Sequence, residues 1–277
     1  MAVDHYENFP VASFLLPKRL RQDVVNIYHF ARSADDIADE GIQTDAQRLE
    51  ALAAYRAHLL SCQPGYPPDR RASDESLKAI FSPLALTIAR HQLPLKPFED
   101  LLSAFEQDIV QTRYRDQTSL DDYCKHSANP VGRLLLHLYG AHTEHNLAYS
   151  DSICTALQRV NFLQDVAIDW QKQRVYLPQD ALERYAVSEA MIAQGDCGPA
   201  WKALMQDQVS SCRALLHFGQ PLGRILSGRL GLELRMIIQG GLRILEKIEL
   251  VQFDVFRQRP ILHKKDWGLI LWRTLRT

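Results

Sequence analysis

Apolar residues recur every three or four positions along most of this chain, which is the period of amphipathic α-helices. The segment Lys18–Glu40 is an example, with apolar residues at Leu20, Val24, Val25, Ile27, Tyr28, Ala31, Ala34 and Ile37. Pro17 precedes this segment, and proline suits the first turn of a helix. No stretch alternates apolar and polar residues as a half-buried strand would. We therefore expect an all-α protein.

The same period predicts further helices, separated by short segments that contain proline, glycine or polar residues. The predicted helices are Ala46–Leu60, Glu75–His91, Lys96–Val110, Ser119–His126, Gly132–Tyr139, Asp151–Gln171, Pro199–Phe218 and Leu222–Phe256. Residues 61–70 contain three prolines and a glycine, which predicts a loop. No internal repeat or low-complexity segment is evident, so we expect a single helical domain over residues 1–277.

Composition narrows the class of protein. The chain is 46% hydrophobic, which supports a sizeable core, and its formal charge of −1 gives no general attraction to nucleic acid. The five cysteines are widely spaced without a CxxC pair, as expected for reduced thiols in the cytoplasm. The first residues lack the basic and apolar regions of a signal peptide, and no apolar run approaches the roughly 20 residues of a membrane span. We expect a cytoplasmic protein.

Candidate chemistry first appears in the segment Lys18–Glu40. Tyr28, Arg32, Asp35, Asp36 and Asp39 are spaced so that they share one helical face. Carboxylates one turn apart repel each other, so a cation should lie nearby. Mg²⁺ prefers such oxygen ligands and takes one or two carboxylates together with phosphate oxygens. A solvated acidic helix end is the alternative, and for this cluster alone it is the more frequent explanation.

A second polar stripe interrupts the apolar segment Asp151–Gln171. It consists of Gln158, Asn161, Asp165 and Asp169, again three or four residues apart. Their neighbours are apolar, so the carboxylates should point into a cleft, where a shared metal ion would offset the cost of burial. Salt bridges to nearby basic residues, Lys172 or Arg174, are the alternative.

The two acidic pairs together are more specific than either alone. Facing helices of a bundle can bring such pairs together. We therefore predict that Mg²⁺ binds between Asp35/Asp39 and Asp165/Asp169.

Several segments resemble the squalene and phytoene synthase family. Residues 28–40 and 160–178 resemble its two aspartate-rich signatures, and residues 13–32, 121–136 and 250–262 resemble its first helices, middle signature and C-terminal segment. The likeness covers nearly the whole chain. It implies an all-α isoprenoid synthase helical bundle with a central cavity, whose apolar depth holds prenyl chains and whose mouth holds a Mg²⁺-bound isoprenoid diphosphate.

The resemblance also implies roles for individual residues. The metal-binding positions are matched by Asp35, Asp36, Asp39, Asp165 and Asp169, with Asn161 beside them. The diphosphate-binding positions are matched by Tyr28, Arg32, Gln158, Asn161, Arg174, Tyr176 and Arg259, with Lys125 and His126 as further candidates. Of these, we expect Arg32, Asp35, Asp39, Asp165 and Asp169 to be catalytic. A lone histidine or lysine in a helix is usually structural or solvated.

Three departures from the family pattern bear on the reaction. Residues 125–130 replace the usual tyrosine before V-A-G, Gln164 stands where relatives often carry arginine, and Ile168 stands where many carry glutamate. These departures resemble the hydroxysqualene synthase branch of the bacterial hopanoid pathway. That branch adds water to presqualene diphosphate, releasing hydroxysqualene and diphosphate without a nicotinamide cofactor. The alternatives are a head-to-head prenyltransferase that condenses two prenyl diphosphates, and a non-catalytic helical partner of a second synthase.

Two further features leave alternatives open. The aromatic residues Phe14, Tyr28, Phe105 and Phe162 could wall a site for a carbocation, although helical aromatics more often pack in a core. The C-terminal residues 259–277 mix basic and large apolar side chains, which suits either peripheral contact with the inner face of the membrane or a packed helix. Functional coupling to other squalene-pathway enzymes is also expected from the resemblance.

Overall fold

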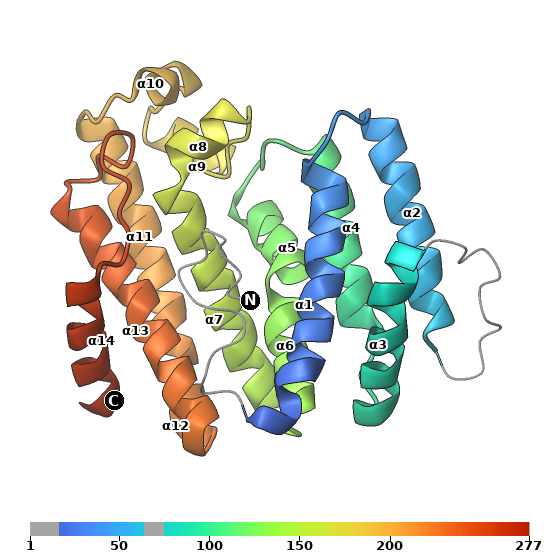
Figure 1. The fold of residues 1–277 in the computed structure, drawn as a ribbon. Coiled ribbons are helices and arrows are strands. Elements are labelled where there is room, and N and C mark those ends of the chain that lie inside the picture. The colour runs from blue at the N-terminus through green and yellow to red at the C-terminus, as the bar shows by residue number, and fades with distance from the viewer. Residues whose placement is uncertain (1–16, 64–74, 277) are drawn as a thin grey trace. The chain divides into compact units, whose positions relative to one another are not determined.

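The computed structural model describes residues 17–63 and 75–276, and these residues form fourteen helices and no strand (Figure 1). An isolated parallel bridge pairs Arg113 with Val175. The all-α prediction is therefore confirmed. Among the described residues, no helix has the length and apolar composition needed to cross a bilayer. Phe14 lies outside the described residues.

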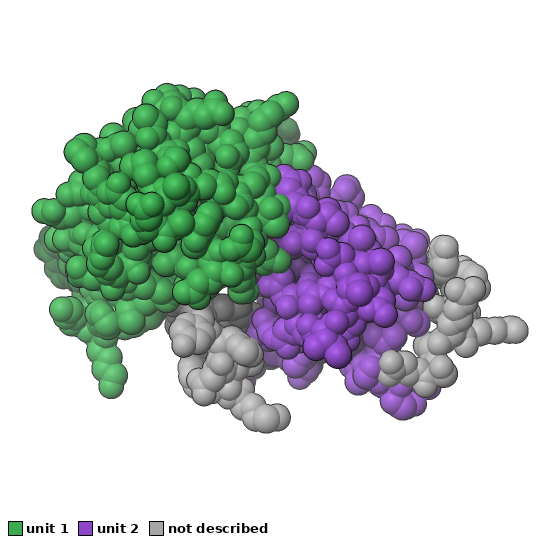
Figure 2. All heavy atoms as spheres, turned by 90° about the horizontal axis from the view of Figure 1, so that it is seen from above, with its two compact units in different colours: residues 1–10, 112–125, 144–277 green, residues 11–111, 126–143 purple. Residues whose placement is uncertain are grey.

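The chain forms two compact units, which Figure 2 colours separately. Unit 2 covers Val11–Gln111 and His126–Thr143. Its helices are α1 (Lys18–Asp39), α2 (Asp45–Ser61), α3 (Glu75–His91), α4 (Lys96–Val110) and α6 (Asn129–Leu138). Helix α1 packs against α2, α3 and α4, and α4 also packs against α6.

Unit 1 covers Met1–Pro10, Thr112–Lys125 and Glu144–Thr277. Its helices are α5 (Gln117–Ser127, whose last two residues belong to unit 2), α7 (Glu144–Gln164), α8 (Val166–Gln171), α9 (Gln179–Arg184), α10 (Glu189–Gln194), α11 (Pro199–Gly219), α12 (Leu222–Ile225), α13 (Gly228–Leu250) and α14 (Lys264–Arg276). Helices α7, α11 and α13 pack against one another, and α14 packs on α13. The expected single domain and central cavity stay predictions.

Local signals place most of the helix ends. Helices α3 and α4 have the predicted bounds, and α1 ends one residue earlier than predicted. Helix α2 begins at Asp45 because Thr44 and Gln47 form a capping box: the Gln47 N–H donates to Thr44 Oγ1, and the Thr44 N–H donates to Gln47 Oε1. Helix α10 ends at its C-cap residue Gly195, whose φ is +64°. Glycine adopts this left-handed conformation at little cost because it has no Cβ.

Two predicted helices were wrong because each is broken. The predicted helix Asp151–Gln171 begins earlier, at Glu144, and is interrupted at Asp165, where φ is −108° and ψ is 13°. The predicted helix Leu222–Phe256 is interrupted after Ile225, resumes at Gly228 and ends at Leu250. The short helices α9 and α10 were missed, because six residues are too few to establish a period.

An aromatic core fixes α1 in unit 2. Phe30 is fully buried, and its ring centroid lies 5.3 Å from those of Tyr55 and Phe98. The Tyr55 hydroxyl donates to the Phe30 carbonyl at 3.0 Å, which satisfies the buried phenol. At the other end of α1, the buried Asp23 accepts from Thr87 Oγ1 at 3.1 Å and lies 2.9 Å from His91 Nε2. These contacts hold the helix that bears the first acidic cluster.

Candidate active site

The first acidic cluster lies in the last two turns of α1 and surrounds one arginine. Arg32 Nη1 lies 2.8 Å from Asp35 Oδ2, and Arg32 Nη2 lies 2.6 Å from Asp36 Oδ1 and 2.9 Å from Glu40 Oε1. Asp35 and Asp36 are half-buried, whereas Asp39 is exposed. The cation that the repelling carboxylates require is thus Arg32.

Three carboxylates of this cluster share the single guanidinium of Arg32. This guanidinium pairs with the carboxylates of Asp35, Asp36 and Glu40 near the C-terminal end of α1, where the helix dipole also disfavours anions. Tyr28 lies one turn before Arg32 and is half-buried. A divalent cation near these side chains would relieve both sources of repulsion.

The second acidic motif lies at the junction of α7 and α8. Asp165 is the residue at which the helix is interrupted, although its N–H still donates to the Asn161 carbonyl at 2.9 Å. Its own carbonyl accepts from the N–H groups of Ile168 at 2.8 Å and Asp169 at 2.9 Å. Asp165 and Asp169 are therefore held one turn apart by backbone hydrogen bonds across the break.

Arg259 binds the carboxylate of Asp165 through two nitrogens of its guanidinium group. Arg259 Nε donates to Asp165 Oδ1, and Arg259 Nη2 donates to Asp165 Oδ2 at 3.1 Å, from 94 residues away in the sequence. This bidentate geometry is the strongest form of a guanidinium–carboxylate pair. For Asp165, the structure thus adds a partner that the local sequence did not indicate, an arginine 94 residues away.

A buried glutamine fixes the segment that carries Arg259. The Gln164 side chain is 1% exposed, and its Nε2 donates to the carbonyl of Pro260, which directly follows Arg259. The position at which relatives often carry arginine therefore ties α7 to the Arg259 segment. A guanidinium there would place a buried cation near the half-buried Arg259, so glutamine suits this arrangement.

Asp169 has an unusual protonation equilibrium. Burial, and then the nearby carboxylate of Asp165, raise the pKa of Asp169 to about 7, against the opposing charges of Lys172, Arg174 and Arg259. The backbone carbonyl of Asp169 accepts from the Arg174 N–H at 2.8 Å, which closes the turn after α8. The carboxylates of Asp165 and Asp169 repel each other in a partly buried environment, so a cation bound by both would be favourable.

The other predicted residues of this motif lie nearby in unit 1. Gln158 is half-buried and Asn161 is exposed on α7, and Arg174 and Tyr176 follow α8. The Tyr176 ring stacks on Phe162 with centroids 3.8 Å apart and planes 3° apart. Tyr114 and Tyr123 complete this aromatic cluster, with centroids 5.7 Å and 6.0 Å from Tyr176. Sequence reasoning missed both tyrosines, although Tyr123 stands in the middle signature.

Lys125 and His126 differ in their surroundings at the end of α5. Lys125 is exposed, whereas the His126 side chain is 27% exposed and its Nε2 lies 3.9 Å from Asp100 Oδ1. Asp100 also pairs with Lys96. A carboxylate beside the imidazole can orient it, so His126 has the better setting for handling a water molecule or a phosphate oxygen.

The donors present suit Mg²⁺ better than a transition metal. Within residues 17–63 and 75–276, no three His, Cys, Asp or Glu side chains form a complete metal cage. Each acidic motif instead offers a few carboxylate oxygens on one helical segment. Mg²⁺ commonly takes one or two carboxylates and completes its shell with water and substrate phosphate oxygens, so the residues fit that ion.

The family model described as "Squalene/phytoene synthase" matches residues 2–266, nearly the whole chain. The chain belongs to the squalene/phytoene synthase family. The matched span contains both acidic motifs and Arg259. Family members typically use Mg²⁺ and bind prenyl diphosphates, which agrees with the carboxylate and arginine groups described above.

Individual relatives and a solved structure agree with this membership. The chain is 36% identical over 236 residues to the hydroxysqualene synthase of Rhodopseudomonas palustris, covering 83% of this chain and 75% of that protein. It is 28% identical over 265 residues to the 15-cis-phytoene synthase of Synechococcus elongatus, covering 91% and 83%. The crystal structure of squalene synthase HpnC from Alicyclobacillus acidocaldarius matches with a TM-score of 0.82 and 32% identity, over 91% of each chain.

Proposed function

We propose that this squalene/phytoene synthase family enzyme converts presqualene diphosphate and water into hydroxysqualene and diphosphate. The observation that carries the choice of reaction is the 36% identity to a hydroxysqualene synthase, against 28% to a phytoene synthase. The departures at residues 125–130, Gln164 and Ile168 point to the same branch. The roles assigned below to site residues are part of the proposal.

The chemistry begins with the loss of diphosphate. The carbon–oxygen bond to the diphosphate breaks, and the leaving group keeps the electron pair. The resulting cyclopropylcarbinyl cation rearranges, a water oxygen bonds to the rearranged carbon, and one proton is released. Because negative charge gathers on the departing diphosphate, the guanidinium groups of Arg32 and Arg259 would stabilise it electrostatically.

The ion pairs of the two motifs support these assignments. In each motif, an arginine proposed to bind diphosphate is paired with an aspartate proposed to bind metal: Arg32 with Asp35, and Arg259 with Asp165. Mg²⁺ and diphosphate together supply a cation for the carboxylates and an anion for the guanidiniums, so every charged group can keep a partner when the ligand binds. When bound, Mg²⁺ also neutralises negative charge on the diphosphate.

Other residues would orient the substrate. Tyr28, Gln158, Asn161 and Arg174 can donate hydrogen bonds to diphosphate oxygens. The stacked Phe162 and Tyr176 present aromatic faces, which attract cations. His126, beside Asp100, is the candidate to position the attacking water.

Product analysis tests the proposal directly. Purified full-length protein is incubated with presqualene diphosphate, in Mg²⁺ and in chelator, and the products are identified by mass spectrometry. Hydroxysqualene that appears only with Mg²⁺, together with no product from farnesyl diphosphate alone, is the expected result. A squalene, dehydrosqualene or phytoene product from farnesyl or geranylgeranyl diphosphate would instead establish the head-to-head prenyltransferase.

A third outcome distinguishes the non-catalytic alternative from the two enzymatic functions. If the chain is only a helical partner of a second synthase, the protein alone gives no product. In a mixture with that synthase, the variant Asp165→Ala would then be as active as the wild type. An active site predicts the opposite, with activity lost in Asp165→Ala. Coupling to other squalene-pathway enzymes stays a prediction.

A further inference from the structure

Helix α14 has two chemically different faces. The face that packs on the protein contains the buried side chains of Asp266, Ile270 and Thr274. On the other face, the large apolar side chains of Leu271, Trp272 and Leu275 are 46%, 51% and 71% exposed. Exposed apolar residues gathered on one helical face mark an interaction surface more often than scattered ones do.

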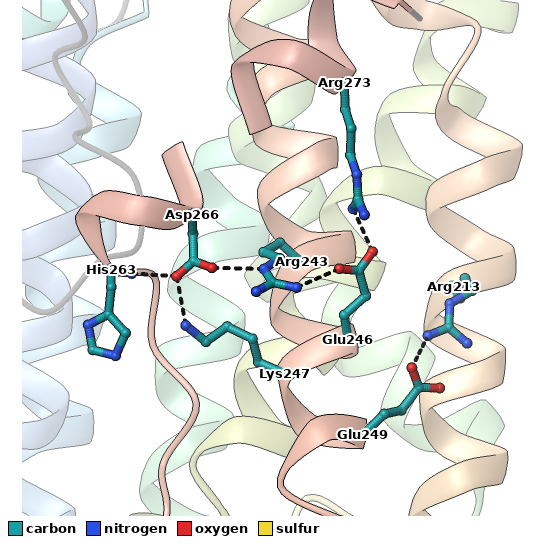
Figure 3. Close-up of polar contacts among 8 residues, drawn as sticks. All are labelled: Arg213, Arg243, Glu246, Lys247, Glu249, His263, Asp266 and Arg273. Atoms are coloured by element: carbon teal, nitrogen blue, oxygen red, sulfur yellow. Dashed lines mark hydrogen bonds and ion pairs between the residues drawn. The ribbon is translucent and has the colours of Figure 1, made fainter. Parts of the chain in front are cut away.

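Ion pairs hold the buried face of α14 in place (Figure 3). Asp266 Oδ2 accepts from Lys247 Nζ at 2.7 Å and from the His263 N–H at 2.8 Å, and Asp266 Oδ1 accepts from Arg243 Nε at 2.8 Å. Arg273 Nη1 pairs with Glu246 about two turns further along α14. Because both turns are anchored on α13, the opposite face of α14 is fixed in its outward orientation.

The outward face is cationic as well as apolar. Lys264, Lys265 and Arg276 are exposed and lie three or four residues from Gly268, Leu271 or Trp272, so all share that face. The helix has one acidic residue, Asp266, and it is buried on the other side. No carboxylate among residues 17–63 and 75–276 pairs with Lys264, Lys265 or Arg276. We call this surface, made by Lys264, Lys265, Gly268, Leu271, Trp272, Leu275 and Arg276, the α14 face.

A pocket adjoins the α14 face. It encloses about 360 Å³ between α11, α13 and α14, and Trp272 and Arg276 form part of its wall. The Arg276 guanidinium lies 4.0 Å from the centre of the Trp272 ring, so the pair presents a cation and an aromatic surface together. Arg213 and Arg273 also line the pocket, each paired with a glutamate.

We propose that the α14 face docks on an anionic phospholipid bilayer, and that the adjoining pocket receives the phosphate of a lipid headgroup. Trp272, Leu271 and Leu275 would enter the headgroup region, where tryptophan is favoured at the boundary between water and hydrocarbon. Lys264, Lys265 and Arg276 would lie against the negative surface potential of the bilayer. The α14 face and its pocket contain none of the proposed site residues, so this docking does not depend on which reaction the enzyme catalyses.

The charge of the α14 face argues against a second copy of this chain as the occupant. A twofold symmetric contact would bring the same three cations of two copies close together without a neutralising acid. The cores of protein interfaces are also depleted in lysine. An anionic bilayer meets both the apolar and the cationic parts of the face.

Vesicle flotation tests the proposal. Full-length protein is mixed with vesicles of phosphatidylcholine alone, or of phosphatidylcholine with 30 mol% phosphatidylglycerol, which is about one anionic lipid in three. We expect flotation with the anionic vesicles, weakened by high salt because the charge attraction is screened. The tryptophan emission should shift to shorter wavelength on binding, and this shift should be absent in Trp272→Phe.

Variants with matched controls locate the surface. Trp272→Gln combined with Leu275→Gln should weaken vesicle binding about tenfold or more, since two apolar side chains no longer enter the interface. Arg276→Glu should weaken binding to anionic vesicles at least about fivefold. Leu86→Gln, at a residue that is 66% exposed on α3, and Arg229→Glu, at an exposed arginine on α13, should bind like the wild type.

Three results would overturn the proposal. One is wild-type protein that stays out of the floating fraction with anionic vesicles. Another is equal flotation of the wild type and the Trp272→Gln/Leu275→Gln variant, with circular dichroism showing that both are folded. The third is the absence of vesicle binding together with another use of this surface. That use would be either a wild-type dimer that is lost in the double variant, or saturable binding of free inorganic phosphate.

Discussion

At the scale of residues, each acidic motif contains an arginine paired with aspartate. The aspartates suit Mg²⁺, and the arginines suit diphosphate. Arg32 lies between Asp35 and Asp36, and Arg259 binds both oxygens of Asp165. Asp169 is the exception, because its pKa of about 7 reflects burial and the repulsion of Asp165. Its proton is therefore the one that metal binding should displace.

The first prediction concerns the pH dependence of Mg²⁺ binding. Since Asp169 is largely protonated below its pKa of about 7, Mg²⁺ must displace a proton there, and the apparent affinity should fall about tenfold per pH unit on further acidification. Above the pKa the affinity should level off. Isothermal titration with Mg²⁺ and inorganic diphosphate between pH 5.5 and pH 8.5, which is about 1.5 units on each side, measures this.

The same raised pKa has a consequence for stability without metal. A carboxyl whose pKa is higher in the folded state favours folding when protonated, so this group destabilises the protein as pH rises from its ordinary value through about 7. Asp169→Asn should therefore raise the melting temperature of the metal-free protein at pH 8 more than at pH 5. Equal gains at both pH values would contradict the assignment and leave Asp169 an ordinary carboxylate.

The second prediction concerns Gln164 as a positioning residue. Gln164→Leu removes the donor to the Pro260 carbonyl, which should loosen Arg259 and reduce kcat/KM about tenfold, the equivalent of one buried hydrogen bond. If the glutamine acts through Arg259, its effect should largely disappear in an Arg259→Lys background. Gln208→Leu, at another buried glutamine, is the control and should affect stability without that coupling.

At the scale of elements, α7 is held by the close approach of α11. Gly219, the last residue of α11, faces Ile153 and the backbone of Tyr149 on α7. A Cβ at Gly219 would lie 2.3 Å from Ile153 Cγ1 and 2.8 Å from the Tyr149 carbonyl oxygen. The helix that carries Gln158, Asn161 and the second acidic motif is thus positioned by a contact that only glycine permits.

The third prediction follows from this contact. Gly219→Ala should destabilise the protein by about 2 kcal/mol, because a backbone oxygen cannot move aside as a flexible side chain can. Gly268→Ala, in α14, is the matched control: its Cβ would meet nothing within 4 Å, so the gain in helix propensity should raise stability by about 0.5–1 kcal/mol. Urea denaturation of both variants measures the difference, and equal effects would contradict the close approach.

The attachment of α14 supplies the fourth prediction. Burial alone would raise the pKa of Asp266, but hydrogen bonds from Lys247, His263 N–H and Arg243 lower it strongly. Asp266→Asn should cost about 3 kcal/mol at neutral pH, since it takes the anion away from the largely buried Lys247 and leaves Arg243 with Glu246 alone. A lowered pKa means that this stabilisation is complete above the ordinary carboxyl pKa of about 4 and is lost as pH falls towards the folded value.

The experiment compares two variants over pH. The stability difference between the wild type and Asp266→Asn should be largest at pH 7 and should shrink below about pH 4. Glu75→Gln, at a glutamate that is 88% exposed, should change stability by less than about 0.5 kcal/mol at either pH. A difference for Asp266→Asn that is constant with pH would mean that its charge does not hold α14.

At the scale of the whole molecule, the two acidic motifs belong to different units. The first lies in unit 2 and the second in unit 1. In each motif, Mg²⁺ and diphosphate together would replace the arginine–aspartate pair, as proposed above. Mg²⁺ alone would compete with the arginines for the carboxylates, and diphosphate alone would compete with the carboxylates for the arginines.

The fifth prediction tests whether Mg²⁺ and diphosphate together replace the arginine–aspartate pairs of the two motifs. Mg²⁺ and inorganic diphosphate together should raise the melting temperature by about 5 °C or more at saturation, whereas each alone should raise it by much less. Chelator should abolish the joint effect. Asp35→Asn and Asp165→Asn should each remove most of it, and a joint shift that survives both substitutions would place the ligand elsewhere.

The sequence alone determined the helical class, the bounds of α3 and α4, and the two acidic motifs, the first of them with Arg32, because a helical period decides which residues share a face. The roles of the site residues stay predictions. Tertiary structure decided the partners: Arg259 for Asp165 across 94 residues, Pro260 for Gln164, and α13 for the buried face of α14. It also decided the break at Asp165. Such contacts depend on packing between segments far apart in the chain, which a local pattern does not contain.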